Sequence, residues 1–309
     1  MTAVLQLAKG YSPAKLGDAV YVSKKLDGVP IRINMRYDGD EAGWWVDSVK
    51  SRQDKPVPST EFIVRYLRKT VDSALPNGLK HTNHLTFVGE VTHEHYTDFK
   101  NVSGIVRRQE PQSGLILNLF DFDDGQGKPF AYRLEAMRTI FSLAGYRVNF
   151  VRVVPQYAIR KEHIERTFDE ILDEHDEGGV IRDADDKWQP GKRTWGYQKY
   201  VIDPTIDLRL HSYEEAISKD GEPLDMVGRM NFWYKGRVIG VGPGKLDYTE
   251  RKYLWEEFKR VTMGNADTAY YREGFGPMAC IKHKRDPSYE DLRQPTFQHW
   301  RDDKDTPDA

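Results

Sequence analysis

Lys25-Leu26-Asp27-Gly28 is the segment of this 309-residue chain whose residue types point most directly to chemistry. It follows a β-rich run at 19–24, which the turn-prone Asp27-Gly28 pair interrupts. A lysine amine at such a strand end is a nucleophile if neighbouring cations or partial burial lower its pKa. The same pattern arises by chance in roughly one chain in ten of this length. Partners elsewhere in the sequence therefore decide between a nucleophile and a solvated lysine in an exposed hairpin.

Polar residues that core packing would not select recur downstream, within or next to strand-like segments. They are Ser51-Arg52, Gly89-Glu90, Phe120-Asp121, the stretch 177–182, and the stretch 187–199, in which bases and aromatics interleave. Cations suit phosphates, carboxylates suit a divalent metal, and an aromatic face suits a base. Each residue has an ordinary explanation when taken singly, because exposed charges and buried Phe are common. Together they predict a site for a nucleoside triphosphate.

The elements that would position these residues are short strands mixed with helices. Runs of β-branched and aromatic residues predict strands at 19–24, 31–37, 44–49, 85–92, 115–122 and 178–182. Helical spacing predicts helices over 58–69, 133–143 and 163–175. So irregular a mixture indicates an α+β fold with antiparallel sheets rather than a doubly wound sheet.

The pattern changes near Asp203-Pro204, where short strands with Gly-rich turns begin. They include the stretch 237–244 and a strand near 278–283, with one helix over 249–261 between them. About 100 residues of this kind suit a small β-barrel such as an OB-fold. The length of the chain also favours two domains. We therefore predict domains at 1–204 and 205–309, the second ending in a mobile, charged tail at 301–309.

Charge and cysteine content set broad limits. The formal net charge is −2, so any site for a polyanion must come from local clustering of Lys and Arg. A single cysteine, Cys280, excludes an intramolecular disulfide and a multi-cysteine zinc site, which fits a reducing cytosol. The first residues do not read as a signal peptide, and no window approaches the length of a membrane span. We expect a soluble, cytoplasmic protein.

In their order along the chain, these motifs resemble those of the covalent nucleotidyltransferases, and within them the ATP-dependent polynucleotide ligases. Lys25-Leu26-Asp27-Gly28 matches the nucleophile motif of that family. The further matches are Ser51-Arg52 with Lys55 and Pro58, the stretch 87–90, the adenine-stacking stretch 117–122, the metal-carboxylate stretch 177–182, and the phosphate-binding stretch 191–199. The resemblance implies a nucleotidyltransferase (adenylation) domain followed by an OB-fold domain.

The C-terminal stretch 292–304 is similar to the closing motif of DNA ligases. In that family an OB domain brings an Arg, an Asp and a Lys over the triphosphate, and the matching residues here are Arg301, Asp303 and Lys304. The resemblance covers residues 25–304. The chain therefore resembles the minimal two-domain DNA ligases of the bacteriophage or bacterial type.

Three positions depart from the family pattern. Pro30 stands where the family has an arginine five residues after the lysine, and Arg32, on the same face of a strand, is the candidate substitute. Tyr197 replaces the first of two lysines in the phosphate-binding motif, which leaves Lys199, with Lys192 as a candidate substitute. Val88 replaces the aspartate before the Gly-Glu pair.

The resemblance implies three phosphoryl transfers, from ATP to Lys25, from the lysyl-AMP to the 5′-phosphate of a nick, and then sealing by the 3′-hydroxyl. It implies Mg²⁺ on Glu90 and Glu177, nicked double-stranded DNA as the partner, and a monomer with a hinge near Asp203-Pro204. Arg301, Asp303 and Lys304 are the expected catalytic partners of Lys25. The residues expected to hold ATP are Ser23, Lys25, Arg32, Arg52, Glu90, Phe120, Lys192 and Lys199.

Two alternatives stay open at this point. An RNA ligase or a GTP-using capping enzyme would share Lys25, both glutamates and Lys199, although the lead-in 292–297 favours a DNA ligase. A non-catalytic nucleic-acid clamp would keep the fold without the chemistry. The intact lysine and both carboxylates argue against that clamp.

Overall fold

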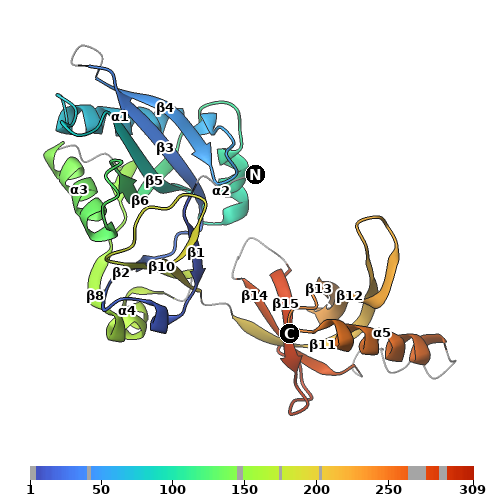
Figure 1. The fold of residues 1–309 in the computed structure, drawn as a ribbon. Helices are drawn as coiled ribbons and strands as arrows, with labels where there is room; N and C mark the ends of the chain where they lie inside the picture. Colours follow the sequence, from blue (N-terminus) through green and yellow to red (C-terminus); the bar gives the residue numbers. More distant parts are fainter. Residues whose placement is uncertain are drawn as a thin grey trace. The chain divides into compact units, whose positions relative to one another are not determined.

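The computed structural model describes residues 5–39, 43–144, 149–173, 176–201, 204–263, 276–284 and 291–309. The chain divides into two compact units, Met1–Ile202 (unit 1) and Asp203–Ala309 (unit 2) (Figure 1). Both units combine largely antiparallel sheets with helices, so the predicted α+β class is confirmed. Asp203 lies outside the described residues, and the hinge expected there stays a prediction.

Unit 1 contains two five-stranded sheets. Sheet A has the order β1 (Leu7–Gly10), β10 (Arg193–Val201), β9 (Gly178–Asp183), β2 (Ala19–Lys24) and β8 (Tyr157–Arg160). Sheet B has the order β4 (Trp44–Ser51), β3 (Val29–Tyr37), β5 (His84–His93), β6 (Leu115–Asp123) and β7 (Val151–Val153). The strand pairs are antiparallel except β1–β10 and β6–β7. The α-helices are α1 (Glu61–Ala74), α2 (Phe99–Val106), α3 (Phe130–Leu143) and α4 (Ile164–Ile171).

The larger core of unit 1 lies against one face of sheet B. Ile31, Ile33 and Met35 alternate along β3 and are fully buried there, under α1, α2 and α3 (Figure 1). Because side chains alternate in a strand, the residues at 30, 32 and 34 face the other way. Sheet A has a smaller core, in which Phe168 of α4 packs with Val22. Each sheet therefore keeps one face free of its own core.

The predicted strands and helices of unit 1 are present, with ends shifted by a few residues. The sequence analysis did not predict β1, β7, β8 or α2. These elements have between three and eight residues, too short to develop a clear hydrophobic period. Strand β10 appeared in the sequence only as a stretch of bases and aromatics, because its residues are mostly partly exposed.

Unit 2 is a five-stranded sheet with one long helix, α5 (Tyr248–Met263). Its strand order is β13 (Arg237–Val241), β12 (Pro223–Tyr234), β11 (Thr205–Ile217), β14 (Met278–Lys284) and β15 (Arg293–Trp300). A parallel bridge joins Gly242, just after β13, to Thr296 of β15. The two ends of the strand order thus meet through one bridge, which is barrel-like, although the described residues do not form a closed, fully paired barrel.

The charged C-terminal residues are attached to β11, so the prediction of a mobile tail was wrong. Asp207 is 6% exposed, and its carboxylate accepts from Arg301 Nη1 at 2.5 Å and from Lys304 Nζ at 3.0 Å. Asp308 donates its backbone N–H to the Asp207 carbonyl at 2.9 Å, and its carboxylate accepts the backbone N–H of Asp207 at 2.8 Å. A nearly buried carboxylate needs such partners, and the tail supplies them.

Candidate active site

Lys25 lies directly after β2, on the free face of sheet A. Its backbone N–H donates to the Gly178 carbonyl at 2.8 Å, which extends the pairing of β2 with β9 by one residue. Strand alternation puts Tyr21, Ser23 and Lys25 on one face. The Lys25 ammonium forms an ion pair with the Glu177 carboxylate, and the two side chains are 26% and 14% exposed. The lysine is therefore partly buried and paired with a carboxylate rather than solvated in an open hairpin.

Gly28 explains how the chain passes from this lysine into sheet B. A Cβ on Gly28 would lie 2.3 Å from the Val91 carbonyl oxygen and 2.9 Å from Cγ of Glu90. No residue with a side chain fits that gap without moving β5. The next residues enter β3, where Pro30 pairs with Glu90. The absence of a side chain at Gly28 thus lets β5 approach closely enough to bring Glu90 toward Lys25.

A second glycine fixes the other carboxylate. Gly178 has φ +133°, a conformation that side chains disfavour, and a Cβ there would lie 2.1 Å from the Tyr200 carbonyl oxygen. This close approach of β9 to β10 holds the preceding residue, Glu177, at the start of β9. The close approach at Gly178 consequently positions Glu177, the residue before it, for its ion pair with Lys25.

Glu90 is the group whose ionisation the site perturbs most clearly. The pKa of its carboxyl is raised to about 8, chiefly by burial; Lys25 and Arg52 oppose that rise, and Glu177 and Asp27 add to it. These four charged groups therefore lie within electrostatic reach of Glu90. A carboxyl with so high a pKa is largely protonated at neutral pH, and an added cation would favour its charged form.

The donor set fits a magnesium ion shared with phosphates. Mg²⁺ in phosphoryl-transfer sites is bound by one or two carboxylates together with phosphate oxygens and waters. Glu90 and Glu177 are two such carboxylates, and Glu177 lies close enough to act on the charge of Glu90. Among the residues that the structure describes, no three His, Cys, Asp or Glu side chains form a metal cluster. The chain thus offers a partial site that a bound nucleotide would complete.

Tyr197 occupies the position where the sequence analysis noted a missing lysine. It pairs with Arg182 across β10 and β9, and Cζ of Arg182 lies 4.1 Å from the centre of the Tyr197 ring. Burial raises the pKa of the Tyr197 phenol, and Glu90 acts in the same direction, although Arg182 and Arg52 oppose it. A neutral hydroxyl on a ring packed against a guanidinium therefore lies beside Glu90.

Arg182 belongs to a buried ion network that the sequence analysis missed. Arg182 pairs with Asp121 and, at 3.3 Å, with Asp186, while Arg133 pairs with Asp121 at 2.9 Å. Arg182 lies in β9 of sheet A, Asp121 in β6 of sheet B, and Arg133 in α3. The network therefore ties the two sheets together beneath Tyr197. Residues so far apart in sequence form no local pattern, and the buried Asp121 next to Phe120 was the one available signal.

The other predicted residues of sheet A lie along β10. Lys199 is exposed and aligned with Val180 and Ser23 across β10, β9 and β2, and so it shares a face with Lys25. Ser23 itself is buried. Lys192 is exposed in the turn before β10, at the opposite end of that strand from Lys199. The structure therefore places Lys199, but not Lys192, in line with Ser23 on the face of sheet A that carries Lys25.

Sheet B contributes Arg32 and Phe120. Arg32 of β3 pairs with Val88 of β5, and two residues earlier Pro30 pairs with Glu90. Because side chains two residues apart in a strand point to the same side, Arg32 and Glu90 lie on the same face of sheet B. Phe120 sits at the bulge between β5 and β6, partly buried, and is not part of the hydrophobic cores that the described residues form. A bulge redirects a side chain, and this ring is free of core packing.

Arg301, Asp303 and Lys304, which match the closing motif, form an ion cluster within unit 2. Arg301 donates from Nε to Asp303 at 2.8 Å, and this contact lowers the pKa of Asp303 to about 2. Arg301 and Lys304 both contact Asp207. These residues contact one another, and the structure does not test their expected role toward Lys25.

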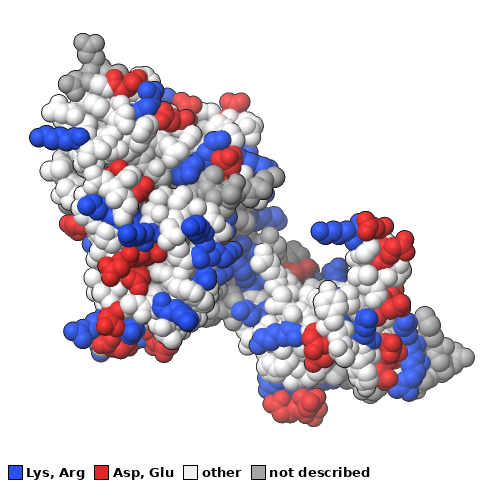
Figure 2. Space-filling view, in the orientation of Figure 1, with Lys and Arg blue, Asp and Glu red and all other residues white. Residues whose placement is uncertain are grey.

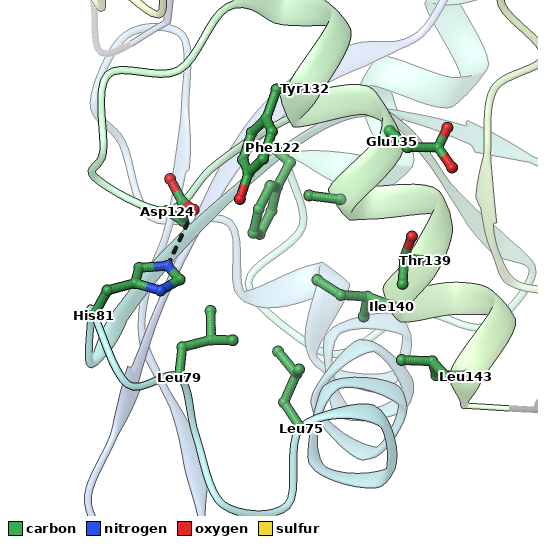
Figure 3. Close-up of a pocket in the computed structure, with 11 residues that line it drawn as sticks. Leu75, Leu79, His81, Phe122, Asp124, Tyr132, Glu135, Thr139, Ile140 and Leu143 are labelled. Atoms are coloured by element: carbon green, nitrogen blue, oxygen red, sulfur yellow. Dashed lines mark hydrogen bonds and ion pairs between the residues drawn. The ribbon is translucent and has the colours of Figure 1, made fainter.

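An apolar cavity of about 330 Å³ lies in unit 1 between α3, the end of β6 and the segment after α1 (Figure 3). At one end His81 Nε2 lies 3.2 Å from Asp124 Oδ2, while Phe122, Ile140 and Leu143 form part of the wall. It contains none of the predicted site residues. The candidate nucleotide site is therefore taken from the residues around Lys25 and not from this cavity.

Comparisons with known proteins agree with the geometry. A family model described as "ATP dependent DNA ligase domain" matches residues 6–200. A search of curated proteins returned no match. None of the helices that the structure describes combines the length and apolar character that a membrane crossing needs.

Solved structures share the fold at low sequence identity. One described as "Pmar-Lig_Pre." has a TM-score of 0.75 and 18% identity, with 97% of this chain and 68% of that chain covered. A Lig E DNA ligase has a TM-score of 0.66 and 16% identity, with 97% of this chain and 100% of that chain covered. The bacteriophage T7 ATP-dependent DNA ligase in complex with ATP has a TM-score of 0.52 and 16% identity, with 96% of this chain and 98% of that chain covered. With the family match over most of unit 1, these findings show that the chain belongs to the ATP-dependent DNA ligase family.

Proposed function

We propose that this protein is an active ATP-dependent DNA ligase that carries AMP on Lys25 and seals nicks in duplex DNA. One observation carries the proposal. The Lys25 ammonium is paired with Glu177, and Glu90 and Arg52 lie within electrostatic reach, at the point where the chain crosses from sheet A to sheet B. A nucleophile, two carboxylates and a cation close to one another suit phosphoryl transfer from a nucleotide.

In the first step the Lys25 ammonium releases a proton to water, and the lone pair of the neutral amine attacks the α-phosphorus of ATP. A nitrogen–phosphorus bond forms while the bond to pyrophosphate breaks, which leaves AMP on the lysine. Lys199 and Arg52 are positioned to offset negative charge on the phosphates, because Lys199 shares the face of Lys25 and Arg52 is close to Glu90. We assign Phe120 to stacking on the adenine.

A bound Mg²⁺ would neutralise charge on the triphosphate as the leaving group departs. Glu90 and Glu177 are the residues that would hold it. Arg301, Asp303 and Lys304 of unit 2 are assigned to the leaving pyrophosphate by their match to the closing motif. The charges of Arg301 and Lys304 suit that task, since both cations can bind phosphate oxygens, and Asp303 holds the Arg301 guanidinium.

In the second step AMP passes from Lys25 to the 5′-phosphate of a nick. In the third, the 3′-hydroxyl attacks that activated phosphate in line, a phosphodiester bond forms and AMP leaves. We propose that the protein works as a monomer. We also propose that it works in the cytoplasm, which the single Cys280 supports because reducing compartments do not select for disulfides.

The test is a two-stage labelling experiment with the full chain. The protein is mixed with Mg²⁺ and either ATP or GTP labelled at the α-phosphate, and then with nicked DNA or nicked RNA. We expect label on the protein from ATP, and its transfer to nicked DNA followed by sealing. Labelling by GTP in preference to ATP, or sealing of RNA in preference to DNA, would contradict the proposal.

A further inference from the structure

A basic and aromatic strip lies along the edge formed by β1 and β10. The Lys9 ammonium sits 3.8 Å from the centre of the Trp195 ring, and Trp195 remains 42% exposed. Arg193 Nη1 donates to the Ala8 carbonyl at 2.6 Å, which fixes this guanidinium against β1. With the exposed Lys192 these residues form the β1/β10 edge strip: Lys9, Lys192, Arg193 and Trp195.

The charges of this strip are not neutralised by neighbouring acids. Among the described residues, no carboxylate forms an ion pair with Lys9, Lys192 or Arg193. Other cations of unit 1 do find partners, as Lys24 does with Asp173 at 2.7 Å. Figure 2 shows Lys and Arg side chains gathered over the part of unit 1 where Figure 1 draws β1 and β10. In a chain of net charge −2, this strip is a local positive feature.

The chemistry of the strip fits a nucleic-acid backbone. Duplex DNA carries one negative charge per about 1.7 Å of its axis, so a row of unpaired cations meets several phosphates at once. An exposed indole offers a flat apolar face for a sugar or base edge, and a lysine resting on that face keeps the ring in place. An acidic peptide would satisfy the cations but gives no reason for an exposed indole among them.

The strip also lies close to the candidate active site. Trp195 is two residues from Tyr197 on the same strand, a separation of about 7 Å at the usual rise per residue. A polymer whose reacting phosphate reaches Lys25 would therefore pass this edge within a few nucleotides.

We propose that the β1/β10 edge strip holds the backbone of duplex DNA next to the nick, with Lys9 on a phosphate and Trp195 against the sugar. This inference rests on the proposed function, because it names where that substrate is held. Lys9 and Trp195 are not among the residues expected to hold ATP, and we assign them no task in the transfer of AMP from ATP to Lys25. These two residues act only when DNA is bound.

The test compares Lys9→Ala, Trp195→Ala and Trp195→Phe with a matched pair on α1. There Lys69 lies over the ring of Tyr66 at 6.0 Å and both are exposed, so Lys69→Ala and Tyr66→Ala remove an exposed cation and an exposed ring elsewhere. The dissociation constant for a nicked duplex is measured by fluorescence anisotropy at about 50 and about 200 mM salt. Self-adenylylation rates are measured on the same proteins.

We expect Lys9→Ala to bind nicked DNA roughly ten-fold more weakly at the lower salt and to reduce the slope against log salt by about 1. Trp195→Phe keeps a ring and should lose less, and Trp195→Ala should lose more. Self-adenylylation should stay at the parent rate in all of them. The α1 variants should match the parent in every measurement.

The inference is overturned if Lys9→Ala and Trp195→Ala bind nicked DNA as the parent does. It is also overturned if their self-adenylylation falls in proportion, since the strip would then serve the fold, or if polyglutamate competes as well as DNA. Failure of the proposed function looks different, because then the parent and the α1 variants would also form no AMP adduct.

Discussion

Gly28→Ala tests whether the close approach of β5 builds the site. The added Cβ would lie 2.3 Å from the Val91 carbonyl oxygen, whereas ordinary contacts begin at 3.4 Å. The strands must therefore separate by about 1 Å, and overpacking of this kind costs about 1–3 kcal/mol of unfolding free energy. Glu90 moves with β5, and a misplacement of about 1 Å can lower a rate by about 100-fold. We expect a folded but destabilised protein whose self-adenylylation is slowed by about that factor.

Gly10→Ala is the matched control, because a Cβ at Gly10 meets nothing within 4 Å. Urea unfolding gives the free energy of unfolding of both variants, and single-turnover labelling with ATP gives the rate. Gly10→Ala should stay within about 1 kcal/mol of the parent and keep its rate. If Gly28→Ala behaves like Gly10→Ala in both measurements, the account of how Glu90 reaches Lys25 is wrong.

Further predictions concern the nucleotide and the buried network. Phe120→Ala should raise the KM for ATP in self-adenylylation by about ten-fold through lost stacking and leave the Tm unchanged; an unchanged KM would make Phe120 a merely structural residue. Asp121→Ala leaves Arg133 and Arg182 buried without their shared partner and should cost about 3–5 kcal/mol in urea unfolding; a loss below 1 kcal/mol, on the order of a surface substitution, would contradict the role of this ion network in tying the two sheets together. Removing divalent cations with a chelator should abolish adduct formation, and excess Mg²⁺ should restore it; full activity under chelation would exclude the role of Glu90 and Glu177.

The local elements of unit 1 were accessible from the sequence because alternation marks a half-buried strand. The run at 19–24 became β2 with the predicted ends, and 115–122 became all but the last residue of β6. What the pattern does not contain is which strand pairs with which. The assignment of β2 and β9 to one sheet and β3 and β5 to another depends on long-range pairing.

The candidate site was predicted unevenly for the same reason. The motif order predicted Lys25 near Glu177, and the structure joins them. Apart from the acidic Asp121 next to Phe120, the sequence contained no sign of the buried contact between Arg133 and Asp121, since burial of a charge is decided by tertiary packing. The tail was predicted to be mobile because its composition is that of a solvated segment, and its partner Asp207 lies 94 residues from Arg301. The functional roles of these residues stay predictions.

Mass spectrometry of the intact protein after incubation with Mg²⁺ and ATP, followed by peptide mapping, tests the central claim most directly. The account predicts a mass increase of one AMP located on Lys25, and none for Lys25→Arg, because a guanidinium stays protonated and does not attack. An unmodified Lys25 in an otherwise folded, ATP-binding protein, or an adduct that persists in Lys25→Arg, would contradict it.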